Sequence, residues 1–337
     1  MTIRIKKDRI EFTANGGSTF TLAESNTGFT FDGTIEATNI FQDGFQGTVS
    51  GYTSGGSPSS PGALNTIDKF PFASDTNATD VGDLTVTRYF LAGASSSVNG
   101  YNAGGYQSPP TVNTIDKFPF ATNSNATDVG DLPTLRYSAG GQSSSISGYS
   151  SAGADSGYVN QSNIYKYPFA TDLNATSVGT VSVARRGVSG QSSSINGYTV
   201  GGINPSPAYS NVIDKFPFAT DTNATDVGDM TVTREMPAGQ SSTTHGYSSG
   251  GNIPPLTNVI DKFSFASDTN ATDVGDLTQA RNGPAGQSST TFGYSSGGGT
   301  PPGGVNTIDK FPFASDTNAT DVGDLSQIRW YAAGQQD

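Results

Sequence analysis

The sequence predicts an all-β protein, a six-bladed β-propeller of four-stranded antiparallel blades preceded by a small N-terminal β-rich segment. Three observations lead to this prediction. One phrase, Asn65-Thr-Ile-Asp-Lys-Phe-Pro-Phe-Ala73, returns five times in near copies spaced 47 to 49 residues apart. No helical periodicity is present within a repeat, and a period of this length without helices is typical of propeller blades. The 43 glycines among 337 residues suit a turn-rich all-β chain.

Three markers set the length of each repeat. The isoleucine of the phrase stands at Ile67, Ile115, Ile164, Ile213, Ile260 and Ile308. A Gly-Tyr pair has its tyrosine at Tyr52, Tyr101, Tyr149, Tyr198, Tyr247 and Tyr294. An arginine follows each isoleucine by 21 residues, at Arg88, Arg136, Arg185, Arg234, Arg281 and Arg329. These markers predict six blades within residues 44–337 and leave residues 1–43 as a separate segment.

Each blade is expected to contain strands a to d in chain order. We predict strand a directly after the arginine, as at 137–141, and strand b around the Gly-Tyr pair. The repeated phrase forms strand c, and strand d lies in regions such as 128–132. Phe118 and Phe120 of strand c are expected to pack between neighbouring blades, where each contributes about 1.5–3 kcal/mol. Such packing makes the contacts between blades the main source of stability.

The two ends of the chain are expected to complete one blade together. The step from an arginine to the next Gly-Tyr glycine is 12 residues, for example from 88 to 100, and the same step from Arg329 passes the last residue, Asp337. Residues 330–335 therefore form a strand a with no strand b after it, and residues 51–56 form a strand b without a complete strand a. Pairing the two closes the ring and removes two exposed sheet edges.

Residues 1–43 are predicted to be a β-rich attachment segment. The strands expected there are Thr2–Lys6, Arg9–Thr13, Thr19–Leu22 and Gly28–Ile35, separated by turn signals. So short a segment buries little surface by itself and needs the propeller, another copy of itself or a partner protein. The alternative is a β-rich cap docked on the side of the propeller.

Charge and composition exclude several classes of partner. The formal net charge is −12, with a pI near 4.4, which argues against binding to nucleic acid. The chain has no cysteine, so neither disulfides nor thiolate chemistry contribute. No run of 18 apolar residues is present, so we expect no membrane insertion.

The loops between strands b and c are the predicted binding face. All length variation between repeats and most sequence variation fall in these loops, which share a face with the crossings from strand d to the next strand a. Prolines stiffen the loops and tyrosines offer rigid contact surface. The residues that we assign to binding are Tyr106, Tyr158, Asn160, Tyr209, Pro254 and Pro302. The alternative is that these are ordinary surface loops whose sequences drift.

Two further motifs have both a functional and a structural interpretation. The six repeated arginines form an anion-binding ring at one mouth of the channel, or each pairs with the aspartate that precedes it by five residues in five of the repeats. The recurring Asp75-Thr-Asn-Ala-Thr-Asp80 has oxygen ligands suited to calcium, but capping of the turn from strand c to strand d explains it more simply. We predict no metal and no cofactor.

The repeat resembles the kelch repeat. The resemblance rests on a Gly-Gly pair, on the Asn and Ile that lead into an aromatic residue, and on the arginine before the next blade. The pairs are Gly55-Gly56, Gly104-Gly105, Gly201-Gly202, Gly250-Gly251 and Gly297-Gly298, with Ala152-Gly153 in the third repeat. The usual tryptophan of the kelch repeat is absent. The resemblance implies the propeller fold and a role as adhesin, scaffold or lectin-like binder.

The start of the chain is similar to virion proteins of marine tailed bacteriophages, including those of cyanophages. The similar stretches are residues 2–12 and 28–33. This resemblance implies a protein on the surface of the extracellular particle, as a tail fibre, tail-associated or capsid decoration protein. Its partners are then other virion proteins, bound through residues 1–43, and a host-surface glycan or protein; self-association into a homo-oligomer is also considered. The alternative is a kelch-type interaction scaffold or lectin-like adhesin not tied to a virion.

The sequence gives little support to catalysis, and we predict that the protein is not an enzyme. The chain has a single histidine, His245, at a position where other repeats carry Ser147, Asn196 or Phe292. A copper oxidase of the kelch type needs two histidines and a cysteine, and a sialidase needs an Asp-box, which is missing. The near identity of the repeats also leaves few places for a unique set of catalytic residues.

Overall fold

The computed structural model describes residues 2–6, 9–13, 19–23, 46–59, 62–107, 111–205 and 208–337. The chain divides into two compact units, Met1–Phe41 and Gln42–Asp337, and each is described by itself. In the first unit β1 (Thr2–Lys6), β2 (Arg9–Thr13) and β3 (Thr19–Ala23) form an antiparallel sheet in that order. These match three of the predicted strands, and the fourth, at 28–35, lies outside the described residues.

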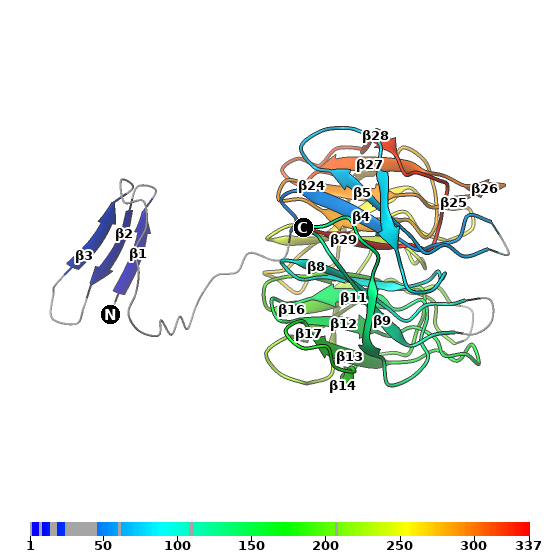
Figure 1. The fold of residues 1–337 in the computed structure, drawn as a ribbon, viewed down its shortest axis with the longest axis horizontal. Coiled ribbons are helices and arrows are strands. Elements are labelled where there is room, and N and C mark those ends of the chain that lie inside the picture. Colours follow the sequence, from blue (N-terminus) through cyan, green and yellow to red (C-terminus); the bar gives the residue numbers. More distant parts are fainter. Residues whose placement is uncertain are drawn as a thin grey trace. The chain divides into compact units, whose positions relative to one another are not determined.

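The second unit is a six-bladed β-propeller, as the repeats predict (Figure 1). Its described residues form six four-stranded antiparallel sheets, in which strands a to d run in order. We number them blades 1 to 6 along the chain. Blades 1 to 3 contain β29 (Ala333–Gln336), β4 (Ser50–Ser54), β5 (Thr66–Pro71) and β6 (Thr79–Asp83); β7 (Ala92–Ser95), β8 (Asn99–Ala103), β9 (Thr114–Pro119) and β10 (Thr127–Asp131); and β11 (Gly140–Ser143), β12 (Ser147–Ser151), β13 (Asn163–Pro168) and β14 (Thr176–Thr180).

Blades 4 to 6 repeat this arrangement, and blade 6 adds a short hairpin in its loop between strands b and c. They contain β15 (Ser189–Ser192), β16 (Asn196–Val200), β17 (Val212–Pro217) and β18 (Thr225–Asp229); β19 (Ala238–Ser241), β20 (His245–Ser249), β21 (Val259–Ser264) and β22 (Thr272–Asp276); and β23 (Ala285–Ser288), β24 (Phe292–Ser296), β27 (Thr307–Pro312) and β28 (Thr320–Asp324). The hairpin consists of β25 (Gly299–Thr300) and β26 (Gly303–Gly304).

Blade 1 closes the ring with strands from both ends of the chain, which confirms the predicted closure. β29 pairs antiparallel with β4, from Ala333 opposite Ser54 to Gln336 opposite Gly51. The predicted start of strand a was wrong by three residues, because β11 begins at Gly140 and β29 at Ala333. The residues between the arginine and strand a belong instead to the crossing between blades. The second residue after each arginine has a positive φ and cannot continue a strand.

The Gly-Tyr pair and the two aromatic residues of strand c build the contact between blades. At every junction the tyrosine stacks on the second phenylalanine of the next blade, with ring centroids 4.7 to 4.9 Å apart. The glycine before the tyrosine leaves room for the first aromatic ring of its own strand c: a Cβ at Gly100 would lie 2.3 Å from Phe118 Cζ. The predicted packing of phenylalanines between blades is confirmed.

A buried ion pair lies beside the aromatic contact at five of the six junctions. The Arg88 guanidinium is 2.9 Å from the carboxylate of Asp116, and neither side chain is exposed. Burial lowers the pKa of Arg88, while the negative charge of Asp116 acts in the opposite direction. The other pairs are Arg185–Asp214, Arg234–Asp261, Arg281–Asp309 and Arg329–Asp68. The partner is the aspartate of strand c in the next blade, so the predicted pairing with the aspartate five residues earlier was wrong.

The junction between blades 2 and 3 has no such carboxylate, because Tyr165 replaces the aspartate. Arg136 donates a hydrogen bond to the Tyr165 hydroxyl at 2.9 Å, and its guanidinium carbon lies 4.8 Å from the centroid of the same ring. Thr134 also contacts that hydroxyl, at 3.0 Å. A cation–π contact and a hydrogen bond from the guanidinium to an uncharged hydroxyl therefore replace the ion pair.

The Asp- and Asn-rich loops between strands c and d join blades at the outer edge. Asn125 accepts a hydrogen bond from the backbone nitrogen of Asp83, in the preceding blade, at 3.0 Å. Lys117 forms an ion pair with Asp172, in the following blade, at 2.7 Å. Equivalent contacts recur around the ring. The repeated motif is therefore explained by contacts between blades, and its last aspartate accepts a hydrogen bond within strand d, as Asp80 does from the backbone nitrogen of Gly82 at 3.2 Å.

Candidate binding face

The loops between strands b and c lie on the same face as the crossings that carry the arginines. At each crossing the residue after the arginine forms an isolated antiparallel bridge with the residue after the small-residue pair. The six bridges are Ser57–Trp330, Tyr89–Tyr106, Tyr137–Ala154, Arg186–Ile203, Glu235–Asn252 and Asn282–Gly299. We call this end of the propeller the loop face, and it comprises these bridges, the loops that follow them and the second residue after each arginine.

The second residues after the arginines form a closed ring around the channel mouth. All six have a positive φ, between 54° and 67°: Phe90, Ser138, Gly187, Met236, Gly283 and Tyr331. Each backbone N–H donates to the carbonyl of its neighbour in the ring, at 2.6 to 2.9 Å. A positive φ is free of strain for glycine, whereas another residue held there costs of the order of 1–3 kcal/mol. At four of the six crossings a residue other than glycine has this strained conformation, and its side chain lies at the centre of the loop face.

The side chains of the loop face divide it into an aromatic side and a polar side. The crossings from blade 6 to 1 and from blade 1 to 2 carry Trp330-Tyr331 and Tyr89-Phe90. On the opposite side, Glu235 accepts a hydrogen bond from Asn252 at 3.0 Å, and Arg186 donates one to Asn160 at 2.8 Å. The six-fold symmetry of the blades is therefore lost on this face.

The aromatic side forms one continuous strip of seven rings. Successive ring centroids are 4.1 to 6.2 Å apart along the order Trp330, Tyr331, Phe90, Tyr89, Tyr106, Tyr137, Tyr158. We call these seven residues the aromatic strip. Its rings range from the buried Tyr137 to Tyr158, which is 64% exposed. Burial raises the pKa of Tyr137 to about 12.

Three of the predicted binding residues lie in the aromatic strip or in a pocket beside it, and the other three lie elsewhere on the loop face. The hydroxyls of Tyr106 and Tyr158 lie 3.4 Å apart in the aromatic strip, and this contact raises the pKa of Tyr106. Pro302 lines a pocket beside Trp330. Asn160 instead holds neighbouring loops together, since it also donates to the Ile203 carbonyl at 2.8 Å. Tyr209 bridges Ile203 within its own loop, and Pro254 is exposed on the loop of blade 5.

The repeated arginines lie beneath the loop face and away from solvent. All six side chains are fully buried. Five are held by carboxylates and Arg136 by Tyr165. An external anion would have to displace a buried partner to reach them, and we do not include the predicted anion ring in the proposed function.

Sequence reasoning missed the residues at the crossings, which supply five of the seven rings of the aromatic strip. The signal was present in the repeats. The two positions after the arginine read Tyr-Phe, Tyr-Ser, Arg-Gly, Glu-Met, Asn-Gly and Trp-Tyr, while the residues around them recur. These positions were assigned to strand a and treated as part of the blade, so their variation was not connected with that of the loops.

No family model matches the chain, and no curated protein matches it. Within the described residues no group of three or more His, Cys, Asp or Glu side chains is arranged to hold a metal ion. The same part of the chain contains no helix with the length and apolar character needed to cross a membrane.

Proposed function

We propose that this protein is a non-enzymatic surface protein of a bacteriophage particle, attached through residues 1–43, whose loop face binds a host-surface glycan. The observation that carries the binding proposal is the aromatic strip, because seven adjoining rings on a varied face have no counterpart among the repeated residues. The apolar face of a sugar ring packs on an aromatic ring, and tyrosine adds a hydroxyl that bonds to sugar hydroxyls. Tyrosines also provide contact area at a low cost in conformational entropy.

The attachment proposal is supported by the resemblance of residues 2–12 to phage virion proteins and by the face of the propeller at which the chain enters it. The first described residues of the propeller lie beside the turns between strands a and b, where Gly47 donates to the Ser288 carbonyl at 2.8 Å. These turns are on the face opposite the loop face. The chain therefore enters the propeller on the face away from the proposed binding residues.

A glycan array tests the binding proposal. The full-length chain is expected to bind at least one bacterial surface glycan, and the double variant Tyr106→Ala/Tyr158→Ala is expected to lose at least tenfold in affinity. Ile195→Ala is the matched control, because Ile195 is 67% exposed and lies in a turn on the opposite face. An array without any bound glycan, or equal binding by the double variant, would contradict the proposal.

Removal of residues 1–43 tests the attachment. The truncated chain is expected to bind the same glycans but to be absent from purified particles. Its recovery in the particle fraction at the level of the full-length chain would contradict the attachment role.

A further inference from the structure

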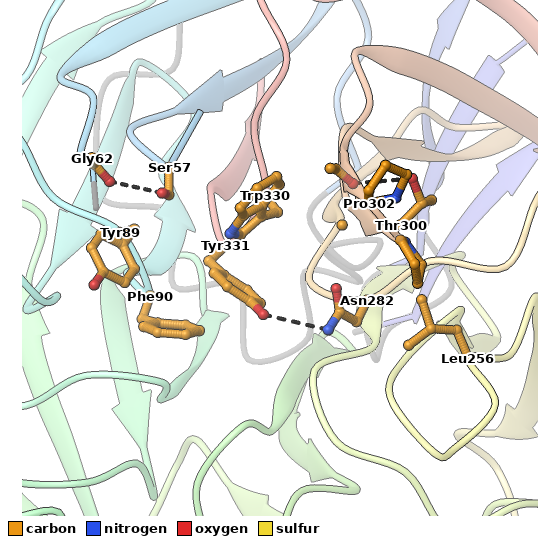
Figure 2. Close-up of a pocket in the computed structure, with 13 residues that line it drawn as sticks. Ser57, Gly62, Tyr89, Phe90, Leu256, Asn282, Thr300, Pro302, Trp330 and Tyr331 are labelled. Carbon is orange, nitrogen blue, oxygen red and sulfur yellow. Dashed lines mark hydrogen bonds between the residues drawn. The ribbon is translucent and has the colours of Figure 1, made fainter. Parts of the chain in front are cut away.

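The loop face contains a pocket of about 530 Å³ next to the aromatic strip. This volume lies within the range of about 300–1,000 Å³ that is usual for sites of small ligands. Figure 2 shows Trp330 and Tyr331 between two walls, with Tyr89 and Phe90 on one side and Leu256, Asn282 and Thr300 on the other. Loops of blades 1, 5 and 6 and three crossings contribute to the lining.

No side chain that lines the pocket is charged. The lining residues are Ser57, Gly62, Tyr89, Phe90, Leu256, Asn282, Gly299, Thr300, Pro301, Pro302, Gly303, Trp330 and Tyr331. The chain as a whole contains 29 Asp and Glu and 17 Lys and Arg residues. A charged group moved from water into such a pocket would lose hydration without gaining a counter-ion. The pocket therefore favours an uncharged ligand.

Trp330 is held in place by the backbone. It exchanges two hydrogen bonds with Ser57, at 2.9 and 3.1 Å. Its indole packs directly over Gly304 of the hairpin, since a Cβ at Gly304 would lie 2.3 Å from Trp330 Cε3. The hairpin is unique to blade 6 among the described blades, and it forms the wall that faces the indole.

Tyr331 occupies the pocket at a cost in backbone strain. Its φ is 59°, and its ring covers Gly283, where a Cβ would lie 2.2 Å from Tyr331 Cδ1. The Tyr331 hydroxyl accepts a weak hydrogen bond from Asn282 at 3.4 Å, and its ring lies 4.1 Å from that of Phe90. Backbone strain at a residue that also lines a pocket is a feature of ligand-binding sites.

We infer that this pocket binds one uncharged pyranose unit of the glycan that the loop face recognises. The sugar ring stacks on Trp330 or Tyr331, and its hydroxyls bond to the Asn282 amide and to the Thr300 hydroxyl. The aromatic strip then follows the rest of the glycan towards Tyr106 and Tyr158. This inference rests on the proposed function and names the class of sugar and its site. An uncharged aromatic pocket also suits a proline-rich peptide, which the experiment below separates.

The chain contains a single tryptophan, Trp330, so its fluorescence reports directly on the pocket. The full-length protein is titrated with the methyl glycosides of glucose, galactose, mannose and N-acetylglucosamine, with N-acetylneuraminic acid, with a decaproline peptide, and with any oligosaccharide that the array selects. We expect a saturable change in fluorescence with at least one neutral sugar and none with the acidic sugar or the peptide.

Two variants complete the test. Tyr331→Gly suits the backbone at that position and is expected to fold, and it should weaken the binding of the neutral sugar at least tenfold. Trp330→Ala should do the same in a direct binding assay, while Ile195→Ala should bind as the unaltered protein does. A preference for the acidic sugar or the peptide would overturn the inference.

The two proposals fail in different ways. Binding of a glycan that leaves the fluorescence unchanged, tolerates Tyr331→Gly and is lost in Tyr106→Ala/Tyr158→Ala would overturn the pocket and leave the proposed function standing. If the unaltered protein binds no sugar in either assay, both are overturned.

Discussion

The junctions between blades and the loop face are built from the same six repeats but follow opposite rules. At the junctions the same groups recur: a tyrosine on a phenylalanine, and a buried arginine on an aspartate at five junctions of six. On the loop face, a few residues further along the chain, the six bridges join six different pairs of residues.

This difference separates stability from recognition. Each junction residue has to fit the neighbouring blade, so a change at one junction weakens the closed ring. The residues of the loop face form a different pair at each crossing, so they are not held to one repeated contact and are free to differ. The junction between blades 2 and 3, with Tyr165 in place of aspartate, is an intermediate case, because it is a junction that departs from the repeat. The following predictions test this separation.

The largest expected effect is alkaline unfolding through the junction tyrosines. Burial raises the pKa of Tyr198, Tyr247 and Tyr294 to about 12, from an ordinary value of 10. The folded state therefore holds these protons more tightly than the unfolded state, and the stabilisation is complete below pH 10 and is lost between pH 10 and 12. Circular dichroism and tyrosinate absorbance should change together in this range. Ionisation of all tyrosines near pH 10 with the fold intact would contradict the prediction.

Loss of one buried carboxylate is expected to come next. Asp309 accepts hydrogen bonds from the backbone and the hydroxyl of Thr278 and pairs with Arg281 at 2.9 Å. Asp309→Asn leaves a buried guanidinium without its counter-ion, and urea unfolding should show a loss of about 3–5 kcal/mol. Asp316→Asn, which breaks an exposed pair with Lys262, is the control and should cost less than about 1 kcal/mol. Equal losses would contradict the assignment of stability to the junctions.

The junction that lacks a carboxylate should be less sensitive. Tyr165→Phe removes the hydroxyl that contacts Arg136 and Thr134 but keeps the ring beneath the guanidinium. We expect a loss of about 1–3 kcal/mol in urea unfolding, since a buried donor loses its acceptor. Tyr158→Phe on the loop face is the control and should change stability by less than about 0.5 kcal/mol. A loss as large as that of Asp309→Asn would show that the two kinds of junction are equivalent.

The smallest expected effect is a gain in stability on the loop face. Ser138 has a φ of 54°, and its buried hydroxyl has no hydrogen-bond partner. Ser138→Gly should raise the free energy of unfolding by about 1 kcal/mol, because it relieves the strain and removes the hydroxyl. Ser138→Ala removes only the hydroxyl and separates the two contributions. A loss of stability in Ser138→Gly would mean that the ring of positive φ is not strained.

Most of the fold could be predicted from the sequence, since the period, the three markers and the count to the C-terminus fixed the number of blades and the closure. The start of strand a could not, because the ring of hydrogen bonds around the channel forces a positive φ at residues such as Tyr331, and that ring exists only once six blades have assembled. The partner of each arginine was also missed. The aspartate five residues away is close in sequence, but the aspartate of the next blade is close in space.

The candidate site was predicted only in part. Tyr106 and Tyr158 were chosen from variable loops, and the structure brings their hydroxyls together across 52 residues of chain. The pocket could not be predicted, because it joins Trp330 near one end of the chain with Ser57 near the other and with a hairpin of blade 6.

The sequence by itself determined the number of blades, their order and the residues that pack between them, because a strict repeat has to satisfy the same contact at every junction. Only the tertiary structure decided which of the unrepeated side chains meet. Closure of the ring brings together loops that are far apart in the chain, and no local pattern records which aromatic residues then share a surface.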